Sequence, residues 1–297
     1  MGSLGSELST YLLLAWLLPL FGFCIEVLGG RWGRNRQDKR AAYLAIACIG
    51  ASFLLSSFTF YRWGTENHWQ AFAASDDSGQ HSVASLVDDG HQEKAHGEDK
   101  HGKDGGHNEH AGGNGDDVAH ADEHAAEGHA DEAHHGPGPS YSGTFYTLAT
   151  FGALNLSIDY YIDSLTILMF CMVTLIATCI HIFAVGYMSD ELTDEYVDHN
   201  AHTSDGNHVH RPGRFHRFFS FLSLFCFSML GIVLAGNIFQ VFVFWELVGI
   251  SSFLLIGFYT ERKSANVAAN KAFIVNRVGD FGFIIGLMIL WTYCGTF

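Results

Sequence analysis

Six long apolar runs, separated by polar segments, dominate the pattern of the chain. Each run comes close to the roughly 20 apolar residues that a helix needs to cross the hydrocarbon core of a membrane. The first run has no basic segment before it and no small-residue cleavage site after it, so we interpret it as a span and not as a signal peptide. The pattern therefore predicts an all-α integral membrane protein with about six transmembrane helices, at residues Leu8–Leu28, Ala41–Tyr61, Ser164–Met188, Phe218–Leu234, Ile238–Phe258 and Ala272–Tyr293.

Two different segments separate the second span from the third. Residues 62–145 are rich in Gly, Ala, Asp, Glu and His and have no apolar period, so we expect a disordered acidic insert there. The alternation in "LNLSIDYYID" indicates a short outer hairpin at residues 146–163, and its last residue, Asp163, suits the N-cap of the third helix. The expected organisation is two helices in 1–61, the insert, the hairpin, and helices three to six in 164–297.

The acidity of the protein belongs to the insert. The net charge is −15, and the stretch from Tyr61 to Tyr141 holds 17 of the 31 acidic residues, only 4 of the 16 basic residues and 12 of the 18 histidines. Two interpretations stay open for it. It is a solvated acidic spacer, or it binds divalent metal weakly through closely spaced histidines such as those of "HADEH". Because no fixed ligand spacing is present, we assign no metal ligands.

The basic residues indicate the orientation in the membrane. The first loop, "RWGRNRQDKR", holds five basic residues and one acid, and such loops lie in the cytoplasm. We therefore expect a multi-pass protein of the bacterial inner membrane, with a cytoplasmic loop at 29–40 and the N-terminus and the insert outside. The 189–217 loop then also faces the cytoplasm, and it carries six acidic residues.

Several kinds of site are missing from the sequence. The six cysteines lie in apolar runs without a CxxC pair, which is typical of buried apolar side chains. No aromatic-basic stripe suggests a nucleic-acid partner. No glycine fingerprint, cysteine cluster or Walker motif suggests a cofactor. Any redox chemistry is expected to belong to other polypeptides.

One acid stands in the middle of the fifth apolar run, "VFVFWELVGI". Glu246 lies about eight residues into this run, roughly 12 Å from its outer end. An ionised acid at the centre of a lipid-facing helix costs at least ~2.5–3.5 kcal/mol. Its neighbours one helical turn away cannot pair with it, so a partner must come from another helix or from water, and Gly249 would let either approach. We interpret Glu246 as a proton relay; the alternative is a neutral acid that serves packing alone.

Three further polar groups are candidates for chemistry. Arg277 and Asp280 share one face of the sixth span, where an Arg–Asp pair can lie deeper in a membrane than either charge alone and can tune the charge on Glu246. Alternatively, Arg277 extends toward the cytoplasmic end, with Asp280 as a structural partner. His181, in the third span, is either a relay or a structural hydrogen bonder. We expect Glu26, at the inner end of the first span, to lie at the interface.

Several motifs together carry a resemblance to a known family. They are "RFFSFLSLFCFSMLGIVLAGNIFQVFVFWELVGISSFLLIGFY", "NRVGDFGF", "YIDSLTILMF", "HIFAVGYM" and the opening "LLPLFGF…GGRWG". The chain resembles the L-type subunit of proton-pumping NADH:quinone oxidoreductase, or complex I, whose mitochondrial counterpart is subunit 5. This resemblance implies an antiporter-like channel that binds no redox cofactor itself. Glu246 matches the family's essential glutamate of the fifth helix, and Arg277 and Asp280 match the "NRVGD" motif.

The resemblance also implies partners and leaves alternatives. FMN, iron–sulfur clusters and quinone are expected in partner subunits, with other membrane subunits of complex I and membrane lipid around this chain. The insert is not part of the family pattern. The family's seventh helix, with its lysine, is missing, so we expect an N-terminal fragment. One alternative is the large subunit of a multi-subunit sodium/proton antiporter, which shares the W-E-L signature, but the "NRVGD" motif disfavours it. A metal carrier is a second alternative, and the presence of only one histidine in a predicted span, His181, disfavours it. A third is a remnant without transport of its own.

Overall fold

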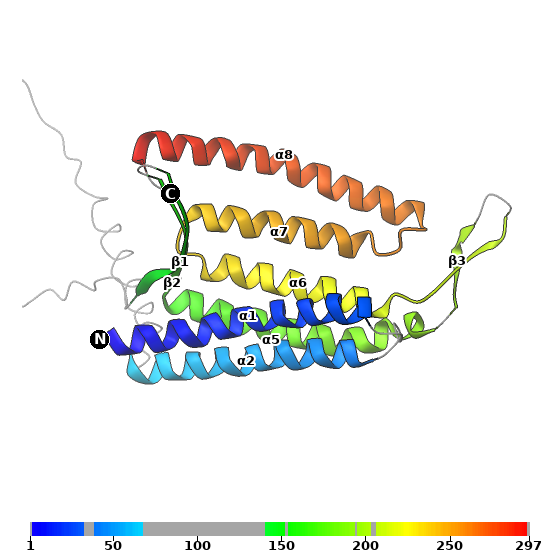
Figure 1. Cartoon of the computed structure of the whole chain (residues 1–297), viewed down its shortest axis with the longest axis horizontal. Helices are drawn as coiled ribbons and strands as arrows, with labels where there is room; N and C mark the ends of the chain where they lie inside the picture. Colours follow the sequence, from blue (N-terminus) through cyan, green and yellow to red (C-terminus); the bar gives the residue numbers. More distant parts are fainter. Residues whose placement is uncertain are drawn as a thin grey trace, which may run out of the picture. The chain divides into compact units, whose positions relative to one another are not determined.

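A computed structural model describes residues 2–32, 39–67, 140–151, 154–193, 195–202 and 206–295, so nearly all of the predicted insert lies outside the described residues. This part of the chain contains six long helices, shown in Figure 1. All six are long and apolar enough to cross a membrane, which confirms the prediction of six transmembrane helices. The helices are α1 (Gly2–Trp32), α2 (Arg40–Glu66), α5 (Ser164–Tyr187), α6 (Phe215–Leu234), α7 (Ile238–Ile256) and α8 (Lys263–Cys294).

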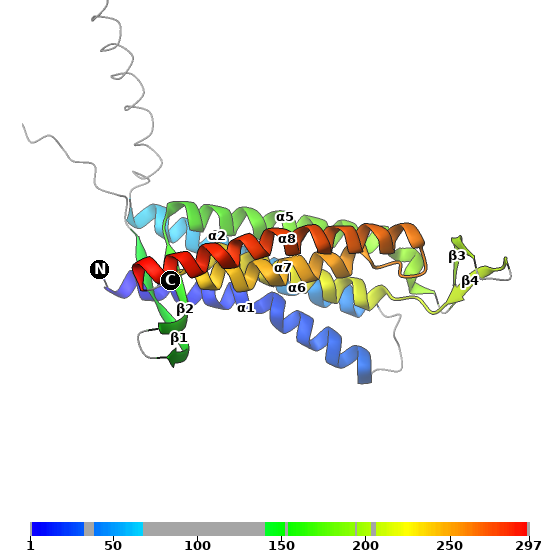
Figure 2. The same ribbon diagram turned by 90° about the horizontal axis from the view of Figure 1, so that it is seen from above.

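The first four helices form a bundle. α1 packs against α2 and α6, and α5 packs against α2 and α6. α7 then packs on α6, and α8 packs on α7, as Figure 1 shows. α1 bends part of the way along its length (Figure 2). The bend is explained by Pro19, because a proline inside a helix removes a backbone donor and clashes with the preceding turn.

Close packing and hydrogen bonds between helices hold the bundle together. Lipid is as apolar as the side chains, so helices in a membrane associate through such contacts rather than through the hydrophobic effect. Trp16 stacks on Phe227 with 5.2 Å between ring centroids, and its Nε1 donates to the Phe227 carbonyl at 3.1 Å. The hydroxyls of Ser56 and Thr174 lie 2.9 Å apart and join α2 to α5.

An antiparallel hairpin precedes α5. Its strands are β1 (Tyr141–Phe151) and β2 (Leu154–Ile162), so in the structure it begins five residues before the expected position. Asp163 then accepts a hydrogen bond from the Thr166 backbone N–H at 2.7 Å, which confirms it as the N-cap of α5. The hairpin is also bound to the start of α7. Asn237 Nδ2 donates to Asp159 Oδ2 at 2.7 Å, and Gln240 Oε1 accepts from the Asp159 N–H at 2.9 Å.

A second hairpin occupies the loop between α5 and α6, where the sequence had suggested no structure. After the short helix η1 (Ser189–Leu192), β3 (Tyr196–His202) pairs with β4 (His208–Arg211). Two of the acidic residues in this loop, Glu191 and Asp198, are buried, with at most 1% of their surface exposed. Buried carboxylates require cations or hydrogen-bond donors, and the structure supplies them from the end of β4, from the residue before α6 and from the turn between α7 and α8.

These residues form a buried ion network. Both Glu191 oxygens accept from Arg211, each at 2.7 Å. Glu261, in the α7–α8 turn, lies 3.3 Å from Arg211 Nε and 2.5 Å from Arg214 Nη2. Arg262, the residue just before α8, donates from Nε to Asp198 at 2.8 Å. The network therefore ties the β3–β4 hairpin to the residue that precedes α8.

The pKa of several groups in the network is shifted, and Tyr259 and Asp198 are two of them. Burial raises the pKa of Tyr259, between the network arginines, to about 12. Burial by itself would raise the pKa of Asp198. However, hydrogen bonds from Arg262 and from the Asn200 N–H, with the nearby arginine charges, hold that pKa below its ordinary value of 3.8. Asp198 therefore prefers to be ionised in the folded protein.

The lowered pKa predicts a pH dependence of stability. A carboxyl group with a depressed folded-state pKa contributes stability above its ordinary pKa and loses it as the pH falls through the folded-state value. We expect Asp198→Asn to be less stable than the native chain at pH 7. The difference should shrink once the pH falls below about 3.8. Thermal unfolding in detergent between pH 7 and pH 3 measures this. Asp190→Asn, which changes an exposed acid of the same segment, should show no such trend, and an equal trend in both variants would contradict the prediction.

Candidate functional site

The site is built around Glu246 in the middle of α7. Arg277, on the neighbouring helix α8, donates a hydrogen bond from Nη1 to Glu246 Oε2. The Glu246 side chain is only 18% exposed. The partner of the acid thus comes from another helix, as the lack of a partner on its own helix had indicated. A β-carbon at Gly249 would lie 3.6 Å from Nδ2 of Asn276, so α8 passes close to this glycine.

Arg277 lies well inside α8. The helix begins at Lys263, nine residues earlier than the predicted span, because most of the polar stretch "ERKSANVAANK" is helical. Arg277 is therefore about 14 residues, or roughly 21 Å, from the start of the helix. Its guanidinium group lies 4.7 Å from the centre of the Phe273 ring and points across to α7. In the structure the side chain does not extend to the helix end.

Asp280 completes a cluster of three charged groups. Its Oδ2 lies 3.5 Å from Arg277 Nη1, and the residue is 5% exposed. It also lies beside the Glu246 carboxyl group, close enough for the two carboxyls to share a hydrogen bond when one of them carries a proton. Glu246 Oε1 is buried and accepts no hydrogen bond from the residues that the structure describes. Two carboxylates and one guanidinium leave one negative charge, which a single bound proton neutralises.

His181 lies elsewhere in the bundle. It is on α5, which packs on α2 and α6, whereas Glu246 and Arg277 belong to the α7–α8 pair. His181 is 1% exposed, and its Nδ1 donates to the Ala177 carbonyl at 2.7 Å, since a carbonyl can only accept. Its Nε2 has no hydrogen-bond partner within the described ranges, and the ring borders an apolar hollow of about 190 Å³ between α5 and α6. The structure therefore does not bring His181 to Glu246.

Glu26, which we expect at the membrane interface near the inner end of the first span, is covered by neighbouring helices in the structure. Glu26 is 4% exposed and lies among α1, α2 and α6, beside Ser220 and Cys48. The sequence places Glu26 near the end of its apolar run, but it does not show that the first turns of α6 cover this end. Glu26 is thus a second acid inside the bundle, away from the α7–α8 pair.

Two parts of the chain match known families. Residues 148–196 match the family described as NADH-ubiquinone oxidoreductase (complex I), chain 5 N-terminus. Residues 235–297, which contain the whole charged cluster, match the family described as NADH:quinone oxidoreductase/Mrp antiporter, TM.

Similar proteins carry corresponding names. Over 150 residues, half of this chain, it is 41% identical to NADH-quinone oxidoreductase subunit L of Neisseria meningitidis. It is 42% identical over 149 residues to NAD(P)H-quinone oxidoreductase chain 5 of a Synechocystis species, again over half of this chain. A third relative is subunit L of Rhodobacter capsulatus, 45% identical over 47% of this chain. The chain spans only 18 to 19% of the length of these relatives. The predicted resemblance is confirmed: the chain is similar to the L-type, or chain 5, subunits of the NADH:quinone oxidoreductases, and its residues 235–297 match the antiporter membrane family.

Proposed function

We propose that this chain is a membrane subunit of NADH:quinone oxidoreductase that translocates protons, coupled to electron transfer from NADH to quinone. One observation carries the proposal: Glu246, Arg277 and Asp280 meet inside two adjacent membrane-spanning helices. Charged groups in such positions are costly, and they commonly line ion or proton paths. The stretch that matches the antiporter family contains all three residues.

In the proposed mechanism Glu246 is the group that binds and releases the proton. Arg277 Nη1 contacts both carboxyl groups, so it can pair with either of them. When Glu246 is ionised, Arg277 pairs with it. When Glu246 takes up a proton, Arg277 pairs with Asp280 instead, and the net charge of the cluster becomes zero. The exchange of partners would link proton occupancy to the position of one guanidinium group, and His181 is a candidate relay elsewhere in the bundle.

The rest of the reaction is assigned to partners. FMN, iron–sulfur clusters and quinone would be bound by other subunits, and other membrane subunits would lie beside this chain. The five basic residues of the first loop support an orientation with loop 29–40 in the cytoplasm and the N-terminus outside, and the location proposed for the chain is the bacterial inner membrane.

The test is NADH-driven acidification of inverted membrane vesicles from source cells. Vesicles from cells with the gene, without it, and with it restored would be compared at equal NADH oxidation by an artificial acceptor. We expect acidification to depend on the gene, whereas NADH oxidation by the artificial acceptor should not depend on it. Equal acidification in all three preparations would show that the chain takes no part in proton transfer.

A second candidate function is that of a large subunit of a sodium/proton antiporter. The name of the family that matches residues 235–297 includes the Mrp antiporter, so this alternative has support from the same stretch. An antiporter exchanges sodium for protons without NADH. If the chain is an antiporter subunit, sodium added to energised vesicles without NADH should collapse the proton gradient only when the chain is present. A complex I subunit, in contrast, requires NADH to build the gradient.

A further inference from the structure

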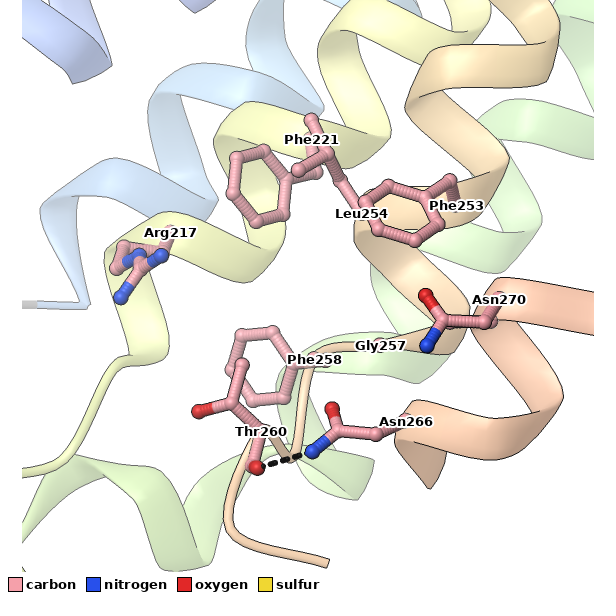
Figure 3. Close-up of a pocket in the computed structure, with 10 residues that line it drawn as sticks. Arg217, Phe221, Phe253, Leu254, Gly257, Phe258, Thr260, Asn266 and Asn270 are labelled. Atoms are coloured by element: carbon pink, nitrogen blue, oxygen red, sulfur yellow. Dashed lines mark hydrogen bonds between the residues drawn. The ribbon is translucent and has the colours of Figure 1, made fainter. Parts of the chain in front are cut away.

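A hollow with a volume of about 160 Å³ lies between α6, α7 and α8, at the end of the helices where α6 and α8 begin and α7 ends. Figure 3 shows the residues around it. Phe221, Phe253 and Leu254 lie together on one side, and Phe258 projects from the α7–α8 turn. Polar groups line the rest, namely Arg217 from α6, Thr260 from the turn, and Asn266 and Asn270 from α8. The hollow therefore joins an apolar wall to a polar one.

The charges around the hollow favour an anion. Arg211 and Arg214 are paired with the buried acids Glu191 and Glu261. Arg217 is exposed and makes no ion pair with any acid in the described part of the chain; its contact is with the Phe221 ring, 5.8 Å from the ring centre. A guanidinium group binds phosphate well, because its planar fork presents two donors to two oxygens. Arg217 thus forms no ion pair of its own in the described part of the chain, and Glu261, whose charge acts on it, is already paired with Arg211 and Arg214.

The polar side offers further donors. Asn266 uses its Nδ2 to donate to the Thr260 carbonyl at 2.7 Å, as the dashed line in Figure 3 marks. The Asn270 amide forms no hydrogen bond with another described residue, and the figure shows it projecting toward the segment around Gly257. An amide group of this kind can donate two hydrogen bonds to phosphate or glycerol oxygens.

The position of the hollow identifies the source of the anion. Arg217 is the third residue of an apolar membrane-spanning helix, so its charge lies near the membrane surface, where arginine side chains reach lipid headgroups. Phe221, one turn further along α6, lies deeper in the membrane. A free phosphate ion would leave the phenylalanine wall without a partner, whereas a phospholipid would cover this wall with its acyl chains.

We propose that this hollow binds one anionic phospholipid, with the phosphate at Arg217 and Asn270 and the acyl chains along Phe221, Phe253 and Phe258. The site is separate from the charged cluster on α7 and α8, and the proposal does not depend on the proposed function. Basic pockets between membrane helices commonly hold anionic headgroups, with roughly 1 kcal/mol per basic residue, or about a fivefold change in affinity.

The test uses the full chain in detergent, titrated with phosphatidylglycerol or phosphatidylcholine of the same chain length and followed by native mass spectrometry. We expect phosphatidylglycerol to bind about five times more tightly than phosphatidylcholine. Arg217→Gln should remove this preference. Lys271→Gln removes one positive charge from α8, next to the lining residue Asn270, but Lys271 does not itself line the hollow. This variant should leave the lipid preference unchanged.

One further variant and one competition experiment complete the test. Asn270→Leu keeps every charge and should weaken phosphatidylglycerol binding, so the proposal stays testable if Arg217→Gln does not fold. Inorganic phosphate at millimolar concentration should not displace the lipid. The proposal is overturned if both lipids bind equally, if Lys271→Gln has the same effect as Arg217→Gln, if Asn270→Leu has no effect, or if inorganic phosphate competes.

Discussion

Glu246→Gln is expected to abolish NADH-driven acidification of membrane vesicles while NADH oxidation by an artificial acceptor continues. Glutamine has nearly the shape of glutamate and can still accept a hydrogen bond from Arg277, but it cannot take up a proton at neutral pH. Proton transfer by a positioned side chain contributes about 10²- to 10⁴-fold, so the acidification rate should fall to background. The variant removes the proton-binding group and leaves the packing of α7 and α8 nearly unchanged.

The matched control is Glu195→Gln. It makes the same chemical change at an exposed acid of the α5–α6 loop, whose partner is His210 on the neighbouring strand. It should acidify vesicles at the native rate. Native acidification in Glu246→Gln, with the subunit present in the membrane at its usual amount, would show that Glu246 is not a proton relay and would favour the packing interpretation of this acid.

The second large effect is expected in the ion network. Arg211→Met leaves the two oxygens of buried Glu191 without the guanidinium that binds both of them. Removing one partner of a buried ion pair costs about 3–5 kcal/mol, because the other charge is left without compensation in a dry environment. We therefore expect a large fall in thermal stability, measured on the purified chain in one detergent at fixed pH.

Two further variants separate this mechanism from simple loss of a charge. Arg62→Met breaks an exposed ion pair with Glu7, whose side chains are 38% and 51% exposed, and should cost less than about 1 kcal/mol. The double variant Glu191→Gln with Arg211→Met should recover part of the loss, because no uncompensated charge is then buried. A fall in stability that is equal for Arg62→Met and Arg211→Met would contradict the role assigned to the network.

The long apolar runs of the chain were sufficient to predict the six membrane-spanning helices, because a run of about 20 apolar residues can adopt few structures other than a helix in a membrane. It was also sufficient to single out Glu246, since an acid inside such a run is conspicuous. Helix contacts were not accessible in the same way. Burial of Glu26 depends on α6 covering it, and the pairing of Arg277 with Glu246 depends on the rotation of α8 about its axis. The β3–β4 hairpin was missed because its buried acids pair with arginines that are distant in the sequence.

The length of α8 has a mechanical consequence. Its 32 residues extend for about 48 Å, well beyond the roughly 30 Å hydrocarbon core. No glycine or proline interrupts the 15 residues from Lys263 to Arg277. This segment is therefore a stiff, uninterrupted stretch of helix. The Arg262–Asp198 pair holds the residue that precedes this segment, and the last residue of the segment carries the guanidinium group that contacts Glu246. A stiff helical segment of about 21 Å thus connects the contact with the β3–β4 hairpin to the charged cluster.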